Sequence, residues 1–149
     1  MKASTGEVYT VYNQYLKRYT ACQVAYIAPP DTVSKESWAV VLSLDWVGDA
    51  PLTAEELPHL RPLYKDFMYW QRDLHLLRVP MEVPQQYTLV GTLPSFTDKP
   101  CRSYGGWSDG YEVYRQLQWQ SIPEKRRQAF KEAMELSLIH ISEPTRHLR

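Results

Sequence analysis

Residues 37–46, SWAVVLSLDW, constrain the fold of this chain more than any other segment, because their side chains alternate in size. Large apolar side chains occupy every second position from Trp38 to Trp46, whereas Ala39, Val41 and Ser43 lie between them. Successive side chains of a strand point to opposite faces of a sheet. The two-residue period therefore predicts a central strand with one buried face and one face that packs more thinly or meets solvent.

Two earlier segments show the same period. Residues 6–12 and 19–27 alternate as strands do, and a polar turn at residues 13–18 joins them. Pro29 and Pro30 end the second strand, because proline has no backbone N–H to donate to a ladder. Together with residues 37–46, these segments predict an antiparallel meander of three strands.

The second half of the chain is predicted to mix strands and helices. Residues 53–56 match a capping box, so a short helix begins there and is kinked or ended by Pro58. The period of residues 63–70 is ambiguous between helix and strand, and the aromatic content favours a strand. The remaining expected elements are strands at residues 77–83, 87–93 and 111–119 and a helix opened by the capping box at residues 121–124.

These elements predict an α+β protein. We expect a bent antiparallel sheet or a partly open barrel of about six or seven strands, with two short helices. Aromatic residues make up 13% of the chain, which favours strands. The pattern shows no internal repeat or linker, so we expect residues 1–135 to form a single globular domain.

The end of the chain has a different origin in our interpretation. Residues 136–146, LSLIHISEPTR, resemble the translation of a common sequencing-library adapter. We therefore expect residues 136–149 to be a non-native tail that follows the native chain after about Glu135, and tails of this kind are left out of functional arguments. His140 and His147 are excluded as candidate ligands for that reason, and His59 and His75 remain.

Charge and hydropathy argue against two classes of partner. The chain carries 17 basic and 17 acidic residues, so no overall field attracts nucleic acid. The basic run at residues 125–127 is offset by nearby glutamates and indicates a solvated helix face. No apolar run approaches the roughly 18 residues of a membrane-spanning helix, so we expect a cytoplasmic protein that binds neither nucleic acid nor membrane.

The pattern of chemically active residues predicts neither an enzyme nor a cofactor. Cys22 and Cys101 lie far apart and form no C-x-x-C pair, so they predict free thiols and no metal site. Asp73 and His75 have the spacing of an oriented base, but no nucleophile accompanies them. The glycines of residues 105–110 lack the Lys-Ser/Thr that a phosphate-binding loop needs, and no helix clearly begins there.

The longest irregular segment, residues 94–109, is the expected place for function, because small domains often carry function on loops. Its candidate partner-binding residues are Tyr104, Trp107, Asp109 and Tyr111, since tyrosine and tryptophan anchor many interfaces and carboxylates steer association. The alternative for Trp107 is a packing role over the core. A second hypothesis is a β-barrel that binds a small ligand or peptide in a pocket lined by Trp38, Trp46 and Trp70.

Several segments also resemble bacterial immunity proteins of polymorphic toxin systems. The chain opens with a Gly-x-Val-aromatic strand at Gly6 to Tyr9, and its second strand contains Gln23-Val24 where many members carry a preceding glycine. The segments VVLSLDW, PLTAEEL and SYGGWSDGYEVY continue the likeness. The resemblance implies a small cytosolic protein that binds and neutralises a cognate toxin by steric occlusion, without catalysis or a cofactor.

Overall fold

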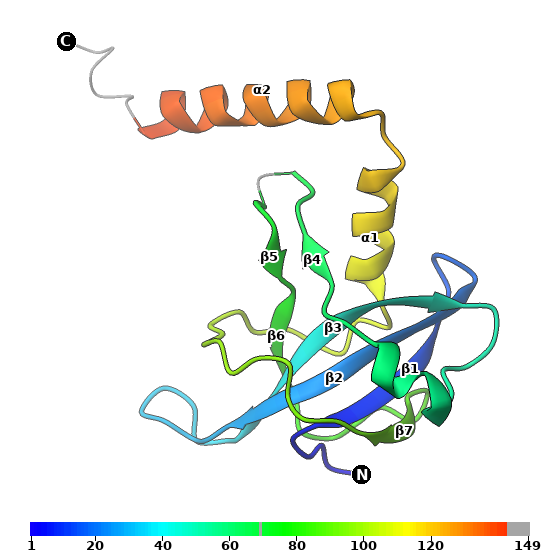
Figure 1. Cartoon of the computed structure of the whole chain (residues 1–149). Helices are drawn as coiled ribbons and strands as arrows, with labels where there is room; N and C mark the ends of the chain where they lie inside the picture. The colour runs from blue at the N-terminus through cyan, green and yellow to red at the C-terminus, as the bar shows by residue number, and fades with distance from the viewer. Residues whose placement is uncertain (69, 143–149) are drawn as a thin grey trace.

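The computed structural model describes residues 1–68 and 70–142 of the chain (Figure 1). The fold is α+β with an open sheet, as predicted. In chain order the elements are β1 (Glu7–Asn13), β2 (Arg18–Ala28), β3 (Trp38–Gly48), the 3-10 helix η1 (Ala54–His59), β4 (Tyr64–Lys65), β5 (Asp73–Leu74), β6 (Leu76–Val79), β7 (Thr88–Thr92), α1 (Tyr111–Gln120) and α2 (Glu124–Ser142).

Five strands form one antiparallel sheet in the order β6-β3-β2-β1-β7, and β4 and β5 form a separate two-stranded hairpin. The predicted meander of β1, β2 and β3 is confirmed. β3 is an interior strand paired on both sides, although β2 occupies the middle of the sheet. β6 lies at one edge of the sheet and ends before Pro80, so the strand predicted for residues 77–83 is shorter than expected, because proline has no N–H to donate to a ladder.

The predicted faces of β3 are confirmed. Val40, Leu42 and Leu44 are fully buried on one face, and Trp38 and Trp46 pack against the same group. We call this group, with its neighbours from β1, β2 and η1, the first core cluster. Ala39 and Val41 point to the other face and pack in a second core cluster, formed mainly by Tyr9, Val11, Cys22, Val24, Val79, Val83 and Tyr87. Both faces of the sheet are therefore covered.

The capping box at Thr53 is confirmed. The backbone N–H and the hydroxyl of Thr53 donate to the Glu56 carboxylate at 3.3 and 3.1 Å. The helix that follows is a 3-10 helix of 6 residues with Pro58 inside it. Proline cannot donate the backbone hydrogen bond that a longer α-helix needs, so the helix stays short.

The prediction of a strand at residues 111–119 is wrong, because this segment is helix α1. Its buried residues are Val113, Gln116 and Trp119, which follow helical spacing. The expectation that no helix begins after the glycine-rich loop is wrong for the same reason. The strand predicted for residues 63–70 is reduced to the two residues of β4, whereas the helix after the second capping box is confirmed as α2.

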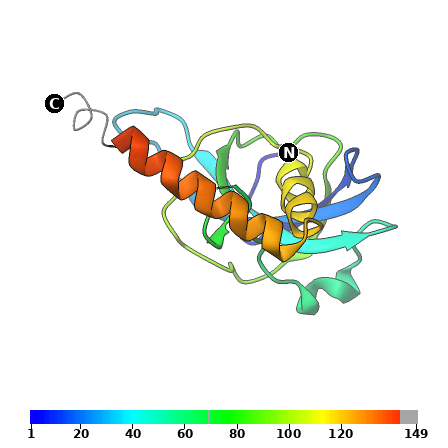
Figure 2. The same cartoon turned by 90° about the horizontal axis from the view of Figure 1, so that it is seen from above.

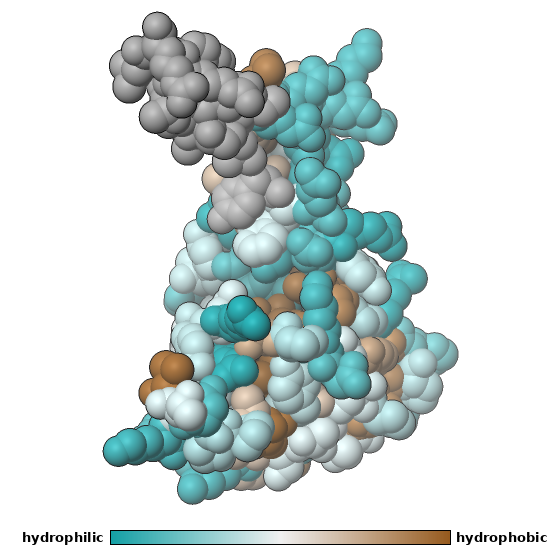
Figure 3. All heavy atoms as spheres, turned by 90° about the vertical axis from the view of Figure 1, so that its left-hand side faces the viewer, coloured by the Kyte–Doolittle hydropathy of each residue, from teal (hydrophilic) through white to brown (hydrophobic). Residues whose placement is uncertain are grey.

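The two α-helices stand on one side of the sheet. α1 rises from the sheet, and α2 turns away from α1 and passes over the β4–β5 hairpin (Figures 1 and 2). Lys131 of α2 donates a hydrogen bond to the carbonyl oxygen of Trp70 in this hairpin. The coloured part of α2 is mostly hydrophilic in the view of Figure 3. α2 continues past Glu135 to Ser142, and residues 143–149 of the expected tail lie outside the described residues.

None of the helices in the described part of the chain combines the length and the apolar character needed to cross a bilayer.

Candidate partner-binding surface

The turn between β1 and β2 is fastened by the side chain of Asn13, which is fully buried. Its Oδ1 accepts hydrogen bonds from the backbone N–H groups of Tyr15 at 3.0 Å and Leu16 at 3.1 Å. Its Nδ2 donates to the carbonyl oxygen of Gly110 at 2.7 Å. One buried amide therefore fixes the turn and joins it to the start of α1.

Gly110 allows α1 to begin close to this turn. Its φ is +81°, a left-handed conformation that side chains rarely adopt. A Cβ at this position would lie 2.4 Å from Oγ1 of Thr20 and 2.5 Å from Nδ2 of Asn13. Only glycine fits, so α1 starts at Tyr111 directly against the β1–β2 turn.

This junction creates a cluster of three tyrosines, Tyr15, Tyr111 and Tyr114, which we call the tyrosine cluster. The ring of Tyr15 meets Tyr111 edge-on with centroids 5.0 Å apart and stacks on Tyr114 at 5.4 Å. Tyr15 is 45% exposed. The rings are held in place by one another, and the cluster presents an aromatic surface to solvent.

Arg115 extends the tyrosine cluster on α1. Its Nη1 donates to the hydroxyl of Tyr111 at 3.2 Å, and its guanidinium also lies over the rings of Tyr111 and Phe67. Cations over aromatic faces are attracted by the ring quadrupole. The surface therefore combines tyrosine and arginine, two residue types that dominate binding energy at protein interfaces.

The structure places the four sequence-predicted residues in different surroundings. Tyr104 is 47% exposed, accepts a hydrogen bond from Nη1 of Arg78 at 3.0 Å and meets the edge of Trp38. Tyr111 belongs to the tyrosine cluster.

Trp107 and Asp109 make internal contacts. The indole N–H of Trp107 donates to the carbonyl oxygen of Pro80 at 2.9 Å, and its ring packs edge-on against Tyr9 and Tyr87. Trp107 thus packs over the second core cluster, in the position that the sequence left as an alternative. Asp109 accepts hydrogen bonds from Gln86, and its backbone N–H donates to the hydroxyl of Tyr87.

Three residues of this surface, Tyr15, Tyr114 and Arg115, were missed by the sequence interpretation. The available signal was an aromatic side chain, Tyr15, within a turn that is otherwise polar. The two helical residues were hidden by the incorrect strand assignment.

His75 and Asp73 do not form the oriented pair that their spacing allows. His75 is buried, and its Nδ1 lies 2.8 Å from Oγ of Ser43. Burial, with a smaller effect of the charge on Lys65, lowers the pKa of His75 to about 3. Oδ1 of Asp73 lies 4.0 Å from Nζ of Lys99. His75 is therefore a neutral side chain held by a serine hydroxyl.

A cavity of about 30 Å³ lies beside Ser43 and His75, under residues 106–110. Its size suits one or two water molecules and is far below that of typical small-molecule sites. The tryptophans of the ligand-binding hypothesis do not line it. Trp38 and Trp46 pack against the first core cluster, and the ring of Trp70 lies under Nζ of Lys65 in the β4–β5 hairpin.

Cys22 and Cys101 are both free and buried. Burial raises the pKa of the Cys22 thiol to about 12, so this thiol is unreactive in the folded state. Within residues 1–68 and 70–142, no three His, Cys, Asp or Glu side chains are grouped so that they could hold a metal ion.

Comparison of the chain with protein-family models, curated proteins and solved structures gives no match in any of the three.

Proposed function

We propose that this protein is a binding protein of the immunity type, which neutralises a cognate bacterial toxin by covering the toxin's active site. The proposal assigns no catalytic step and no cofactor to the chain. The resemblance of its first strands to immunity proteins points to this class, and the tyrosine cluster supplies a surface suited to it.

The observation that carries the proposal is that Tyr15 is exposed to solvent while neighbouring rings hold its side chain in place. Tyr15 is 45% exposed, and its ring contacts both Tyr111 and Tyr114. Tyrosine offers a large contact area and has few rotatable bonds, so it loses little conformational entropy on binding. Rings already fixed by one another reduce that cost further.

Asn13 supports the same proposal. Its hydrogen bonds to Tyr15, Leu16 and Gly110 hold the two segments of the tyrosine cluster in one arrangement. A binding surface that is rigid before the partner arrives favours high affinity. Among the sequence-predicted residues, Tyr111 lies in this surface, and the exposed Tyr104 lies in a second aromatic contact with Trp38.

The test is capture of a partner by the full tagged chain from a lysate of the source organism at low salt. The wild type is compared with the double variant Tyr15→Ala, Tyr114→Ala and with Tyr64→Ala, which alters an exposed tyrosine on β4 outside the cluster. We expect one stoichiometric protein partner, retained by Tyr64→Ala and lost by the double variant.

The captured partner is then expressed alone and together with this protein. We expect growth arrest by the partner alone and protection by co-expression. Absence of a stoichiometric partner, or a partner that does not affect growth, would contradict the proposal.

A further inference from the structure

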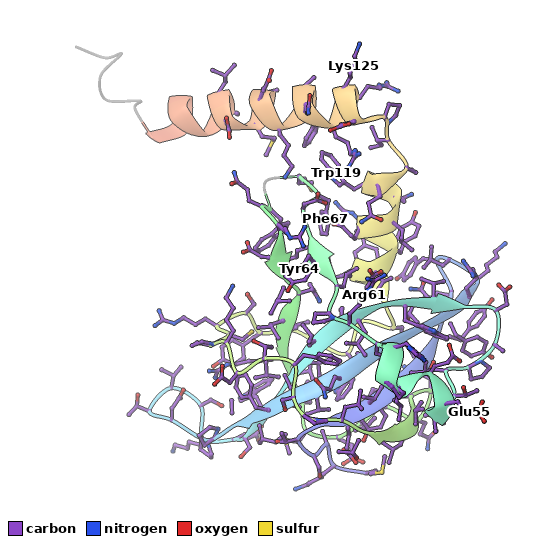
Figure 4. All side chains as sticks on the ribbon, viewed as in Figure 1. Glu55, Arg61, Tyr64, Phe67, Trp119 and Lys125 are labelled. Carbon is purple, nitrogen blue, oxygen red and sulfur yellow. The ribbon has the colours of Figure 1, made fainter. Side chains whose placement is uncertain are left out.

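A hollow lies next to the tyrosine cluster, between α1 and the β4–β5 hairpin. Its volume is about 390 Å³, within the range of small-ligand and side-chain pockets. We call it the arginine pocket; its walls include Phe67, Met68, Arg115, Gln118, Trp119 and Ile122. Figure 4 shows Phe67 on the hairpin and Trp119 at the end of α1, below α2. The pocket therefore combines four apolar side chains with the polar Gln118 and Ser121 and one cation, Arg115.

The guanidinium of Arg115 is held in the wall of the pocket by an aromatic ring, a thioether sulfur and a hydroxyl group. It lies over the ring of Phe67, with 5.2 Å between the guanidinium carbon and the ring centroid. Nη2 lies 3.1 Å from Sδ of Met68, and Nη1 lies 3.2 Å from the hydroxyl of Tyr111. A thioether sulfur is a weak acceptor, so these contacts orient the guanidinium without using its full capacity for charged hydrogen bonds.

No carboxylate of the described chain lies within 4.0 Å of Arg115. Asp66, which precedes Phe67, has its Oδ1 engaged by Nε2 of Gln116 at 2.6 Å. Glu112, one helical turn before Arg115, makes no ion pair with it. A partly buried arginine with donors to spare is suited to a carboxylate from outside, because the fork of the guanidinium matches two carboxylate oxygens.

We propose that the arginine pocket binds an aspartate or glutamate side chain of the protein partner, together with an apolar residue beside it. The carboxylate pairs with Arg115, and the apolar residue packs on Phe67, Trp119 and Ile122. This inference rests on the proposed function, since it assigns the partner chemistry next to the tyrosine cluster.

The charge distribution favours a protein carboxylate over the phosphates of a nucleic acid. The chain has equal numbers of basic and acidic residues. A nucleic-acid surface needs several cations along the backbone of its ligand, whereas one arginine beside apolar side chains suits a single carboxylate.

The test is a titration with 3-phenylpropionate, followed by NMR at the indole N–H of Trp119. The matched probe is 3-phenylpropionamide, which has the same ring and no charge. We expect saturable shifts with the carboxylate and at least tenfold weaker binding of the amide. Equal binding of the two probes, or no saturable shift, would overturn the proposal.

Three variants locate the binding. Arg115→Gln is expected to weaken the binding of 3-phenylpropionate at least tenfold. Arg126→Gln, at an exposed position of α2, is expected to leave the affinity for this probe unchanged. Gln118→Glu keeps Arg115 and places a carboxylate in the pocket wall, so it is expected to block the probe without disturbing the packing around Arg115. Equal weakening by Arg126→Gln, or full binding by Gln118→Glu, would overturn the assignment.

A further titration uses hexauridylate. Tighter binding of this oligonucleotide than of the carboxylate at the same indole N–H would overturn the assignment to a protein partner. The probe titration does not use the captured partner, so the two proposals are tested separately. The arginine pocket can show no carboxylate binding even when the partner binds through the tyrosine cluster. The converse result, a pocket that binds the probe in a protein with no toxin partner, would contradict the proposed function alone.

Discussion

The side-chain amide of Gln23 donates a hydrogen bond to the backbone carbonyl oxygen of Gly6 over 3.3 Å. The backbone N–H of Gly6 in turn donates to the carbonyl oxygen of Val24 at 2.7 Å. Nε2 of Gln23 also lies within hydrogen-bonding distance of the carbonyl oxygens of Leu93 and Pro94, and its Oε1 accepts from Phe96. This fully buried amide therefore ties the start of β1 to the segment after β7.

Substitution of Gln23 is expected to destabilise the fold. Gln23→Leu keeps much of the side-chain volume but removes the donor to the carbonyl oxygens of Leu93 and Pro94 and the acceptor of the Phe96 N–H, at a cost of about 2–4 kcal/mol. The measurement is the free energy of unfolding from urea denaturation. Gln86→Leu is the control, since Gln86 is exposed and its side chain donates to the carboxylate of Asp109. Equal stability of Gln23→Leu and the wild type would contradict the role assigned to Gln23.

His75 is expected to make the stability fall as the pH falls. Burial lowers its pKa to about 3 in the folded state, whereas the unfolded chain has a value near 6.5. Between these values the unfolded chain binds a proton that the folded chain does not, so the stabilisation is present above pH 6.5 and is lost towards pH 3. From pH 7 to pH 5 the contribution is about 2 kcal/mol.

The check is the pH dependence of urea unfolding for the wild type, His75→Gln and His59→Gln. We expect His75→Gln to lose less stability between pH 7 and pH 5 than the wild type. His59→Gln is the control, because His59 is exposed. The same slope in His75→Gln and the wild type would show that His75 takes up a proton in the folded protein as readily as in the unfolded chain.

Trp107 is expected to contribute to stability through its packing. Trp107→Ala removes the ring contacts with Tyr9 and Tyr87 and the hydrogen bond to Pro80, so we expect a loss of about 2–4 kcal/mol. Trp107→Phe keeps an aromatic ring and is expected to lose less. Thermal unfolding of both variants provides the measurement. Unchanged stability in Trp107→Ala, together with weaker partner binding, would return Trp107 to the binding surface.

The alternation of large and small side chains was sufficient to predict the meander and the faces of β3. The reason is local, because each face of a strand is defined by every second residue. The capping box at residues 53–56 predicted the start of η1 for an equally local reason. The second capping box located α2 but not its first turn, because Ser121 is the C-cap of α1, with its hydroxyl donating to the carbonyl oxygen of Gln118, and α2 begins at Glu124.

α1 was mistaken for a strand because its buried face includes a polar residue. Val113, Gln116 and Trp119 share that face, and the amide of Gln116 bonds to Asp66 from the hairpin. A search for apolar spacing passes over glutamine and finds Tyr111, Val113, Leu117 and Trp119 at alternating positions. The partner that makes Gln116 a core residue lies far away in the sequence, so no local pattern identifies it.

The tyrosine cluster could not be predicted from the sequence for a similar reason. Tyr15 lies in the turn after β1, and Tyr111 and Tyr114 lie in a helix near the other end of the chain. Their contact depends on the hydrogen bond between Asn13 and Gly110. Of the predicted residues, Tyr111 joined this cluster and Trp107 took a packing position, because the glycine-rich loop folds back over the second core cluster.

The most direct test of the account is the affinity of the captured partner for folded variants of this protein, measured by isothermal titration calorimetry. We expect Tyr15→Ala and Tyr114→Ala each to raise the Kd at least tenfold, which corresponds to about 1.4 kcal/mol, and Tyr64→Ala to leave it within about twofold. Unchanged affinity in both cluster variants, with their folds intact, would contradict the claim that the tyrosine cluster binds the partner.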